Sequence, residues 1–375
     1  MVKNTNVYSL AASGNNIFAT AGYLYDPYGV FLSTNNGTSW TQTSLNNLSV
    51  YRLVISGNNI LAGMEQYGIY SSTNNGINWT LTSLSDRRVY SFAINGNNVF
   101  AGTYYYGLYL STNNGTSWTQ TSLNNRDVRS LAINGNNIFA GVSDSLPRGV
   151  YVSTNNGTSW TQTSLNNRVV WSLAVNGNNV FAGTWDFGVY VSTNNGTNWT
   201  QTSLNSGRVI SLAVYGNSVF AGTEFGVHVS NNNGVSWTQR NEGLITSTFY
   251  TNDFYISNNY IFIGTGRNVW RRPLSELVGI KPISNEIPNH FSLSQNYPNP
   301  FNPTTNIKFS LPNSSFVKLI VTDILGREVA VLVNEKLNVG TYQADWNAVN
   351  YPSGVYFYKL VASDYTETKK MVLVK

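Results

Sequence analysis

The sequence predicts an all-β protein, in which a seven-bladed β-propeller with an incomplete last blade precedes an immunoglobulin-like β-sandwich. Three observations predict this fold. A segment of the form Ser-Thr-Asn-Asn-Gly-x-x-Trp returns every 38 to 42 residues, β-strand-like segments lie between its copies, and the composition changes near residue 274. A period of this length indicates a repeat architecture, and repeats of four short strands are typical of propellers.

Each repeat contains four segments that read as strands a to d of an antiparallel meander. In residues 89–123 these are VYSFAIN, VFAGT, GLYLST and TSWTQTSL, rich in β-branched and aromatic residues and separated by Asn- and Gly-rich turns. Asn and Gly supply the positive φ that tight hairpins need. A small meander cannot bury both of its faces, so the repeats are expected to pack against each other.

The strand a–b pattern occurs seven times, whereas the Trp-bearing c–d hairpin occurs six times. The a–b pairs lie at 7–22, 50–63, 89–102, 128–141, 170–183, 209–222 and 251–264. We therefore predict a propeller over 1–274 whose last blade lacks its outer strand. Either the ring closes on a three-stranded blade, or the native chain begins upstream of Met1; the sequence favours the second, because the first residues also lack the pattern of a signal peptide.

The repeated segment resembles the Asp-box, or bacterial neuraminidase repeat, of sialidases, sortilin-type receptors and photosystem II stability factor-like proteins. Asn replaces the Asp at its third position, where it is expected to cap the turn through backbone N–H groups. The resemblance implies a propeller in which the Trp residues of the repeat are structural. They are Trp40, Trp79, Trp118, Trp160, Trp199 and Trp237.

Length variation between repeats lies in one kind of loop, between strands b and c. This loop has seven residues at 142–148 and three at 223–225, against four in the second, third and fifth repeats. The same loops carry the distinctive side chains, and variable loops on a rigid scaffold are where binding sites usually lie. The candidate ligand-binding residues are Tyr25, Tyr28, Glu65, Tyr67, Tyr104, Tyr105, Tyr106, Arg148, Trp185, Asp186, Phe187, Glu224 and Phe225.

These loops are expected to share a face with the d–a connections that hold Arg88, Arg126, Arg168 and Arg208. Aromatic faces with scattered charges predict binding of a glycan or a protein. The alternatives are a surface glycoside hydrolase, sialidase-like or with a carboxylate pair such as Glu65 and Asp186, or a purely structural surface repeat whose loop residues are solvated tips and plugs of the channel. Binding is favoured over catalysis, and no catalytic residue is assigned, because no Tyr–Glu pair stands out from the repeats.

Composition argues against several other classes. The net charge is +5 with only 10% charged residues, and no run of Lys or Arg exceeds two, so we expect no nucleic-acid partner. Cys is absent and there are two His in different regions, so we expect no metal site and no cofactor. No apolar run reaches the ~20 residues of a transmembrane helix.

The C-terminal part begins with a mixed Pro, Gly and polar stretch at 275–290, which reads as a linker. Residues 291–375 then contain alternating segments, such as TNIKFSL, SFVKLIVTD, GVYFYKLVA and ETKKMVLVK, with Gly and Pro turns between them. This pattern predicts a small antiparallel β-sandwich of about seven strands.

Residues 291–375 closely resemble the type A C-terminal sorting domain of bacterial type IX secretion. The matching positions include Tyr297, Pro298, Asn299, Pro300, Phe301, Asp323, Gly326, Trp346, Gly354, Tyr356, Lys369, Lys370 and Lys375. The resemblance implies that the secretion machinery is a partner, with Pro298, Asn299, Pro300, Gly354, Tyr356, Lys369, Lys370 and Lys375 in the sorting signal. It also implies a secreted protein, or one on the outer surface of a Gram-negative bacterium.

Overall fold

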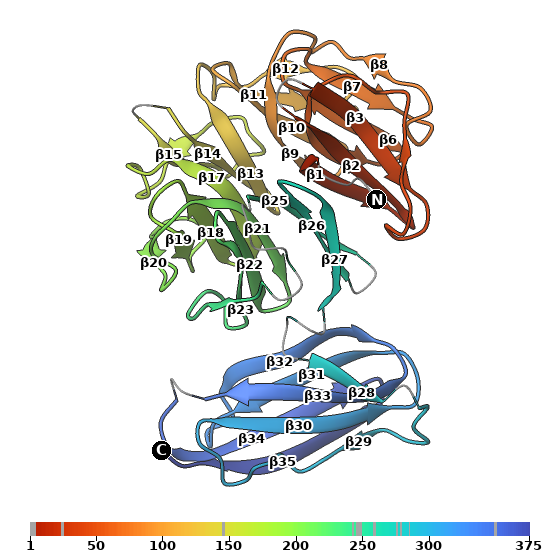
Figure 1. Ribbon diagram of the computed structural model, residues 1–375. Helices are drawn as coiled ribbons and strands as arrows, with labels where there is room; N and C mark the ends of the chain where they lie inside the picture. The colour runs from red at the N-terminus through yellow and green to blue at the C-terminus, as the bar shows by residue number, and fades with distance from the viewer. Residues whose placement is uncertain are drawn as a thin grey trace. The chain divides into compact units, whose positions relative to one another are not determined.

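The computed structural model describes residues 5–23, 26–144, 147–241, 244, 250–257, 260–274, 277, 280–284, 286–348 and 351–375. The elements formed by these residues are all β-strands (Figure 1). Their contacts divide the chain into two compact units, the first extending to Arg272 and the second containing Pro273–Lys375. The predicted all-β class is confirmed.

The first unit is a propeller of seven sheets, each a meander of consecutive strands. Blade 1 is β1 (Asn6–Ser13), β2 (Asn16–Tyr23), β3 (Asp26–Ser33) and β4 (Thr41–Gln42); blade 2 is β5 (Val50–Ser56), β6 (Asn59–Met64), β7 (Ile69–Ser72) and β8 (Thr80–Leu81). Blade 3 is β9 (Val89–Asn95), β10 (Asn98–Thr103), β11 (Gly107–Ser111) and β12 (Thr119–Gln120); blade 4 is β13 (Val128–Asn134), β14 (Asn137–Val142), β15 (Gly149–Ser153) and β16 (Thr161–Gln162).

The remaining blades follow the same order. Blade 5 is β17 (Val170–Asn176), β18 (Asn179–Thr184), β19 (Val189–Ser192) and β20 (Thr200–Gln201); blade 6 is β21 (Val209–Tyr215), β22 (Ser218–Thr223), β23 (Gly226–Ser230) and β24 (Thr238–Gln239). Blade 7 is β25 (Thr251–Ser257), β26 (Tyr260–Thr265) and β27 (Val269–Pro273). Its sheet has three strands, as predicted.

The first strand of each blade is the innermost, because these strands contact one another around the whole ring and β25 contacts β1. Three side chains of blade 7 join it to blade 1. Asn252 Nδ2 donates to Val7 O at 2.9 Å, Tyr255 Oη donates to Ala12 O at 3.1 Å, and Asp253 Oδ2 accepts from Leu10 N at 2.8 Å. The ring therefore closes between blade 7 and blade 1 on the three-stranded sheet.

The repeated hairpins use the same hydrogen bonds in each blade that carries them. In blade 3, Ser111 Oγ accepts from Gly115 N at 2.9 Å, and Asn113 Oδ1 accepts from Ser117 N at 3.0 Å. This is the turn-capping role expected of the Asn. Trp118 is half-buried, donates from Nε1 to Gly115 O at 3.0 Å and packs on a cluster formed by blades 2 and 3.

The second unit contains two four-stranded sheets, with strand orders β28-β33-β30-β29 and β32-β31-β34-β35. The strands are β28 (Ile280–Ser284), β29 (Ser292–Leu293), β30 (Thr304–Leu311), β31 (Ser315–Thr322), β32 (Glu328–Leu337), β33 (Gly340–Asn347), β34 (Gly354–Ala362) and β35 (Tyr365–Leu373). Alternate side chains of β30, β31 and β34 are buried in one core that includes Phe309, Leu319, Trp346 and Tyr358. The predicted immunoglobulin-like sandwich is confirmed.

The prediction that 275–290 is a linker is wrong for part of that segment. Residues 280–284 form β28, which pairs antiparallel with β33 through Ile280 opposite Ala344 and Lys281 opposite Gln343. The register shifts between Pro282 and Ser284. A Pro is tolerated here because β28 lies at the edge of its sheet, where a missing N–H breaks no ladder.

Candidate functional site

The b–c loops and the starts of the innermost strands lie at the same end of the blades. The register of the first two strands shows this, with Val89 opposite Thr103 in blade 3 and Val170 opposite Thr184 in blade 5. In blades 2, 3, 4, 5 and 7, a backbone hydrogen bond then ties the loop to the preceding connection. Tyr104 N, for example, donates to Arg88 O at 3.0 Å. The predicted loops are therefore held in place on this face by the main chain.

At this end the central channel contains a cavity of about 310 Å³, to which every blade contributes. This volume is at the lower end of the ~300–1,000 Å³ range of small-molecule sites. Each blade contributes the second residue of its innermost strand or, in blade 1, the residue at the equivalent position of the repeat. In blade order these channel residues are Tyr8, Tyr51, Tyr90, Arg129, Trp171, Ile210 and Asn252, and Arg52 of blade 2 also lines the cavity.

Five successive channel residues form a continuous wall. The ring centroids of Tyr8 and Tyr51 are 5.7 Å apart, edge to face, and those of Tyr51 and Tyr90 are 5.9 Å apart and stacked. The Arg129 guanidinium lies 4.4 Å from the Tyr90 ring and 5.1 Å from the Trp171 ring. The channel residues of blades 1 to 5 are thus four aromatic side chains and one cation, Arg129. Ile210 and Asn252 are the channel residues of blades 6 and 7.

Three of the predicted loop residues contact this wall or the residues beside it. Tyr104 packs on Tyr90 with centroids 5.8 Å apart, and Trp185 packs on Trp171 at 4.2 Å. Glu65 pairs with Arg88 at 3.5 Å. Burial raises the pKa of Tyr51, and the neighbouring Glu65 carboxylate raises it further. Tyr51 therefore stays protonated at neutral pH and can act as a hydrogen-bond donor.

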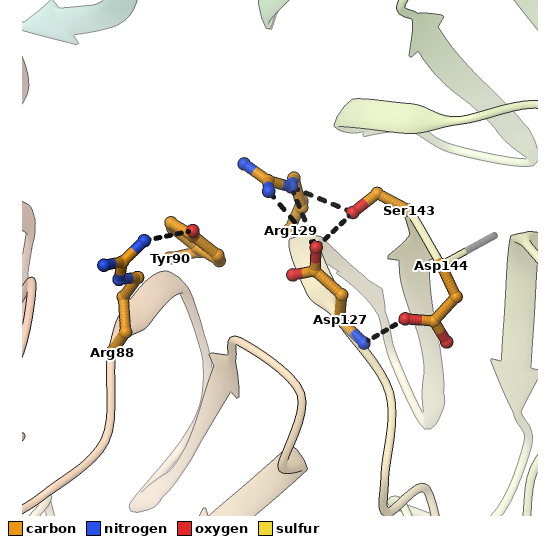
Figure 2. A network of polar contacts seen from close by, with 6 residues as sticks. All are labelled: Arg88, Tyr90, Asp127, Arg129, Ser143 and Asp144. Atoms are coloured by element: carbon orange, nitrogen blue, oxygen red, sulfur yellow. Dashed lines mark hydrogen bonds and ion pairs between the residues drawn. The ribbon is translucent and has the colours of Figure 1, made fainter.

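The cation of the wall is held by a polar network within blade 4 (Figure 2). Arg129 donates from Nε and Nη2 to Asp127 Oδ2 at 3.3 and 3.2 Å, and from Nε to Ser143 Oγ at 2.9 Å. Asp127 N in turn donates to Asp144 Oδ1 at 2.7 Å. Burial raises the pKa of Asp127, although the Arg129 charge and the Ser143 hydrogen bond oppose this effect.

A second cavity of about 200 Å³ continues the channel past Arg52 and Arg129. It is bordered by the side chains two residues further along six of the innermost strands, which are Leu10, Leu53, Phe92, Leu131, Leu173 and Leu212. The four leucines of blades 1, 2, 4 and 5 are each less than a tenth exposed. The same cavity is also lined by polar side chains of the innermost strands, so its wall is mixed: Ser9, Ser91, Ser130, Ser172, Ser211 and Asp253.

The other predicted loop residues that the structure describes line neither cavity. Tyr67, Tyr105, Tyr106, Phe187 and Phe225 are exposed, by 43 to 65%, and Asp186 is exposed as well. The Arg87 guanidinium covers the Tyr106 ring and that of Arg168 covers Phe187, both at 3.9 Å. Arg148 and Tyr28 are half-buried, and Glu224 Oε1 accepts from Arg208 N at 3.3 Å. Tyr25 lies outside the described residues.

The channel residues themselves were not predicted, although the sequence holds a signal for them. In the innermost strands, the residue just before the channel position is Val in six blades. The residue two positions after the channel position is Leu or Phe in all seven. Between these repeated neighbours the channel position reads Tyr, Tyr, Tyr, Arg, Trp, Ile and Asn. A comparison of the repeats by position, rather than by loop length, identifies this divergence.

In the second unit, the predicted sorting residues gather where β34 begins and β35 ends, with Gly354 opposite Leu373 and Tyr356 opposite Met371. Asn299 Oδ1 accepts from Val372 N at 2.9 Å, and Phe301 bridges Leu373. Tyr356 is buried and donates to Pro352 O at 2.8 Å. Pro298, Pro300, Gly354, Lys370 and Lys375 are exposed, whereas Lys369 is half-buried and pairs with Glu367 at 2.9 Å.

A family described as the secretion system C-terminal sorting domain matches residues 295–375. These residues are a secretion-system C-terminal sorting domain. The sorting domain implies export by the type IX secretion system, to the cell surface or beyond, and interaction with its machinery. In the part of the chain that the structure describes, no helix has the length and apolar character needed to cross a membrane.

Solved structures share the arrangement of the propeller that precedes the sorting domain. PorZ of Porphyromonas gingivalis, a surface component of the type-IX secretion system, is 16% identical with a TM-score of 0.57; the alignment covers 99% of this chain and 59% of PorZ. YCF48 from Cyanidioschyzon merolae is 13% identical with a TM-score of 0.57, covering 73% of this chain and 96% of YCF48. No curated protein matches the sequence.

The WD40 propeller domain of Doa1 gives a similar result. It is 14% identical with a TM-score of 0.56, and the alignment covers 72% of this chain and 93% of that domain. These structural matches establish the propeller fold. At identities this low they do not identify a ligand.

Proposed function

We propose that this exported propeller binds a glycan in the channel cavity on its b–c loop face. The observation that supports the proposal is the wall of Tyr8, Tyr51, Tyr90, Arg129 and Trp171 around the 310 Å³ cavity. Ligand sites typically combine apolar and aromatic walls with a few placed polar groups. The apolar C–H faces of a sugar pack on aromatic rings, and its hydroxyls bind to Arg and Asn side chains.

Two further features of the site support a binding role. The loops behind the wall are fixed by main-chain hydrogen bonds, so the cavity is formed before any ligand arrives and little ordering entropy opposes binding. The volume of the upper cavity, about 310 Å³, suits one or two sugar rings rather than a long segment.

The glycoside hydrolase alternative has less support. A tyrosine nucleophile can be activated by a neighbouring general base, and Glu65 lies beside Tyr51. The Arg88 guanidinium, 3.5 Å from the Glu65 carboxylate, favours its charged form and makes it a weaker base. Of the carboxylate pair considered from the sequence, Glu65 is paired with Arg88 and Asp186 is exposed on its loop.

Protein binding is a second candidate, favoured by the exposed aromatic side chains of the loops. Tyr67, Tyr105 and Phe225 are each more than half exposed. Exposed aromatic residues of this kind are enriched in protein interfaces. In this case the loop tips, rather than the channel, would carry the affinity.

An array of immobilised bacterial and plant polysaccharides tests the glycan proposal. We expect saturable binding of the full chain to at least one of them, and we expect Trp171→Ala to weaken it about tenfold or more because a stacking face is lost. Trp118→Ala, which removes an indole from the opposite end of blade 3, is the matched control and should leave the affinity unchanged. Absence of binding to every polysaccharide, or equal affinity of Trp171→Ala, would refute the proposal.

A further inference from the structure

Blade 4 departs from the repeat in two ways that the structure connects. Its channel residue is Arg129, where the other blades have Tyr, Trp, Ile or Asn. Its b–c loop is the longest of the full-length repeats, and that loop supplies Ser143 and Asp144. Both of these loop residues belong to the network that holds Arg129 (Figure 2).

The network leaves the guanidinium little freedom. Ser143 Oγ donates to Asp127 Oδ2 at 2.6 Å and accepts from Arg129 Nε at 2.9 Å, so the three side chains form a closed set. Asp127 is only 5% exposed, and its main chain is fixed by Asp144, which pairs with Arg126 at 3.5 Å. An Arg fork that is already oriented loses less entropy when it binds a ligand.

The surroundings of Arg129 determine which of its donors remain for a ligand. The guanidinium lies over the rings of Tyr90 and Trp171, and its Nε and Nη2 donate to Asp127. Among the residues that the structure describes, Nη1 has no hydrogen-bond partner. Arg129 lines both cavities, so a ligand in the channel would lie beside this side chain.

The charges at this site largely offset one another. Two arginines line the upper cavity, Arg52 and Arg129. Asp127 neutralises Arg129, and Asp253 lies close enough to Arg52 for the two charges to interact. A site with near-zero net charge discriminates by hydrogen bonding, since an anion would gain little from it.

From this geometry we propose that Arg129 is the specificity-determining residue, donating to adjacent hydroxyl oxygens of an uncharged sugar, and that Asp127 and Ser143 are its positioning residues. The inference rests on the proposed glycan function and adds the ligand class and the selecting group. It also explains why the long loop belongs to blade 4, since the same blade supplies the cation that the loop holds.

Calorimetric titration of the full chain with neutral trisaccharides (maltotriose, cellotriose, mannotriose, chitotriose) and with trigalacturonic acid tests the inference. For the best neutral ligand we expect Arg129→Lys to weaken binding about tenfold or more, because an ammonium cannot replace the planar fork. Asp127→Asn should weaken it about fivefold and Ser143→Ala about twofold. Asp86→Asn, which removes the exposed partner of Arg87 on the same face, is the matched control and should change nothing.

A second measurement separates positioning from general damage to the fold. The charged groups that face Asp127 are Arg129 and, through its main chain, Asp144 with Arg126. Protonation of Asp127 would break its ion pair with Arg129. The affinity of the wild-type protein for the neutral sugar should therefore fall as the pH is lowered past the raised pKa of Asp127. The affinity of Asp127→Asn should show no such fall. Its melting temperature reports separately on folding.

The outcomes distinguish the two proposals. Binding of a neutral sugar that is equally strong in Arg129→Lys would overturn this inference alone. Tighter, strongly salt-dependent binding of trigalacturonic acid would also overturn it, because the site would then select an anion. No binding of any trisaccharide or polysaccharide would overturn the proposed function itself.

Discussion

The two ends of the propeller blades differ in how strictly the repeat is kept. At the hairpin end, each Ser-x-Asn-x-Gly turn makes the same hydrogen bonds, as between Ser111 Oγ and Gly115 N and between Ser192 Oγ and Gly196 N. At the channel end, the residue that each blade contributes differs. Sequence identity between repeats therefore marks the scaffold, because every blade needs the same turn, and divergence marks the surface where one asymmetric site can form.

The largest effect is expected where a hairpin glycine touches the neighbouring blade. Gly115 has φ of +88°, and a Cβ there would lie 2.5 Å from Leu61 of blade 2. Gly115→Ala should cost about 3–5 kcal/mol, the sum of left-handed strain and overpacking. Gly135→Ala is the matched control, with φ of +59° and open space, and should cost about 1–2 kcal/mol. Equal losses in urea denaturation would show that the blades are not packed through these hairpins.

The next effect concerns the repeated indole. Trp118→Ala should lower the free energy of unfolding by about 2–4 kcal/mol, somewhat less than a core Trp, because Trp118 is only half-buried. Its affinity for the glycan should be unchanged. Trp171 is half-buried as well, so Trp171→Ala should lower the free energy of unfolding by a similar amount but, unlike Trp118→Ala, should also lose affinity. A loss of affinity in both variants would remove the distinction between the two ends of the blades.

A smaller effect is expected at the seam of the ring, where Asp253 replaces the Ser that most blades have at this position. Burial raises the pKa of Asp253 above its unfolded value, despite the opposing Arg52 charge. The folded state then binds the proton more tightly, so wild type should gain stability relative to Asp253→Asn as pH falls from 7 toward about 4. Urea midpoints that move in parallel for the two proteins would contradict this expectation.

The smallest effect is expected at the loop tips. Phe225 is 65% exposed. Its turn is held through its main-chain carbonyl, which accepts from the side-chain amides of Gln239 and Asn241, so its ring is not needed for the turn. Phe225→Ala should change the free energy of unfolding by less than about 0.5 kcal/mol. If it instead abolishes capture of a protein partner while the glycan still binds, the loop tips form a second, separate surface.

Much of the fold was predictable from the sequence because the repeat leaves few alternatives. Seven copies of strands a and b, Gly-rich turns and six Trp-bearing hairpins predict seven blades with an incomplete last one. The strand at 280–284 was missed because it is short and contains Pro282. A segment of this kind reads as a linker unless its pairing with β33 is known.

The site was predictable only in part. Loop variation pointed to the face of the proposed site and to Glu65, Tyr104 and Trp185, which contact channel residues. It also pointed to Tyr67 and Phe225, which are exposed, because the first and last side chains of such a loop point in different directions. The channel residues occupy one position in each repeat, and the contact between Arg129 and Ser143 depends on a pairing of strands that spacing alone does not give.

Hydrogen exchange with and without the glycan selected on the array tests the central claim most directly. The account predicts that bound glycan slows exchange at the starts of the innermost strands, at residues 50–52, 89–91, 128–130 and 170–172, and in the adjoining b–c loops. The hairpins that carry the Trp residues, at the other end of the blades, should be unaffected. Protection confined to those hairpins, or to the sorting domain, would contradict the account.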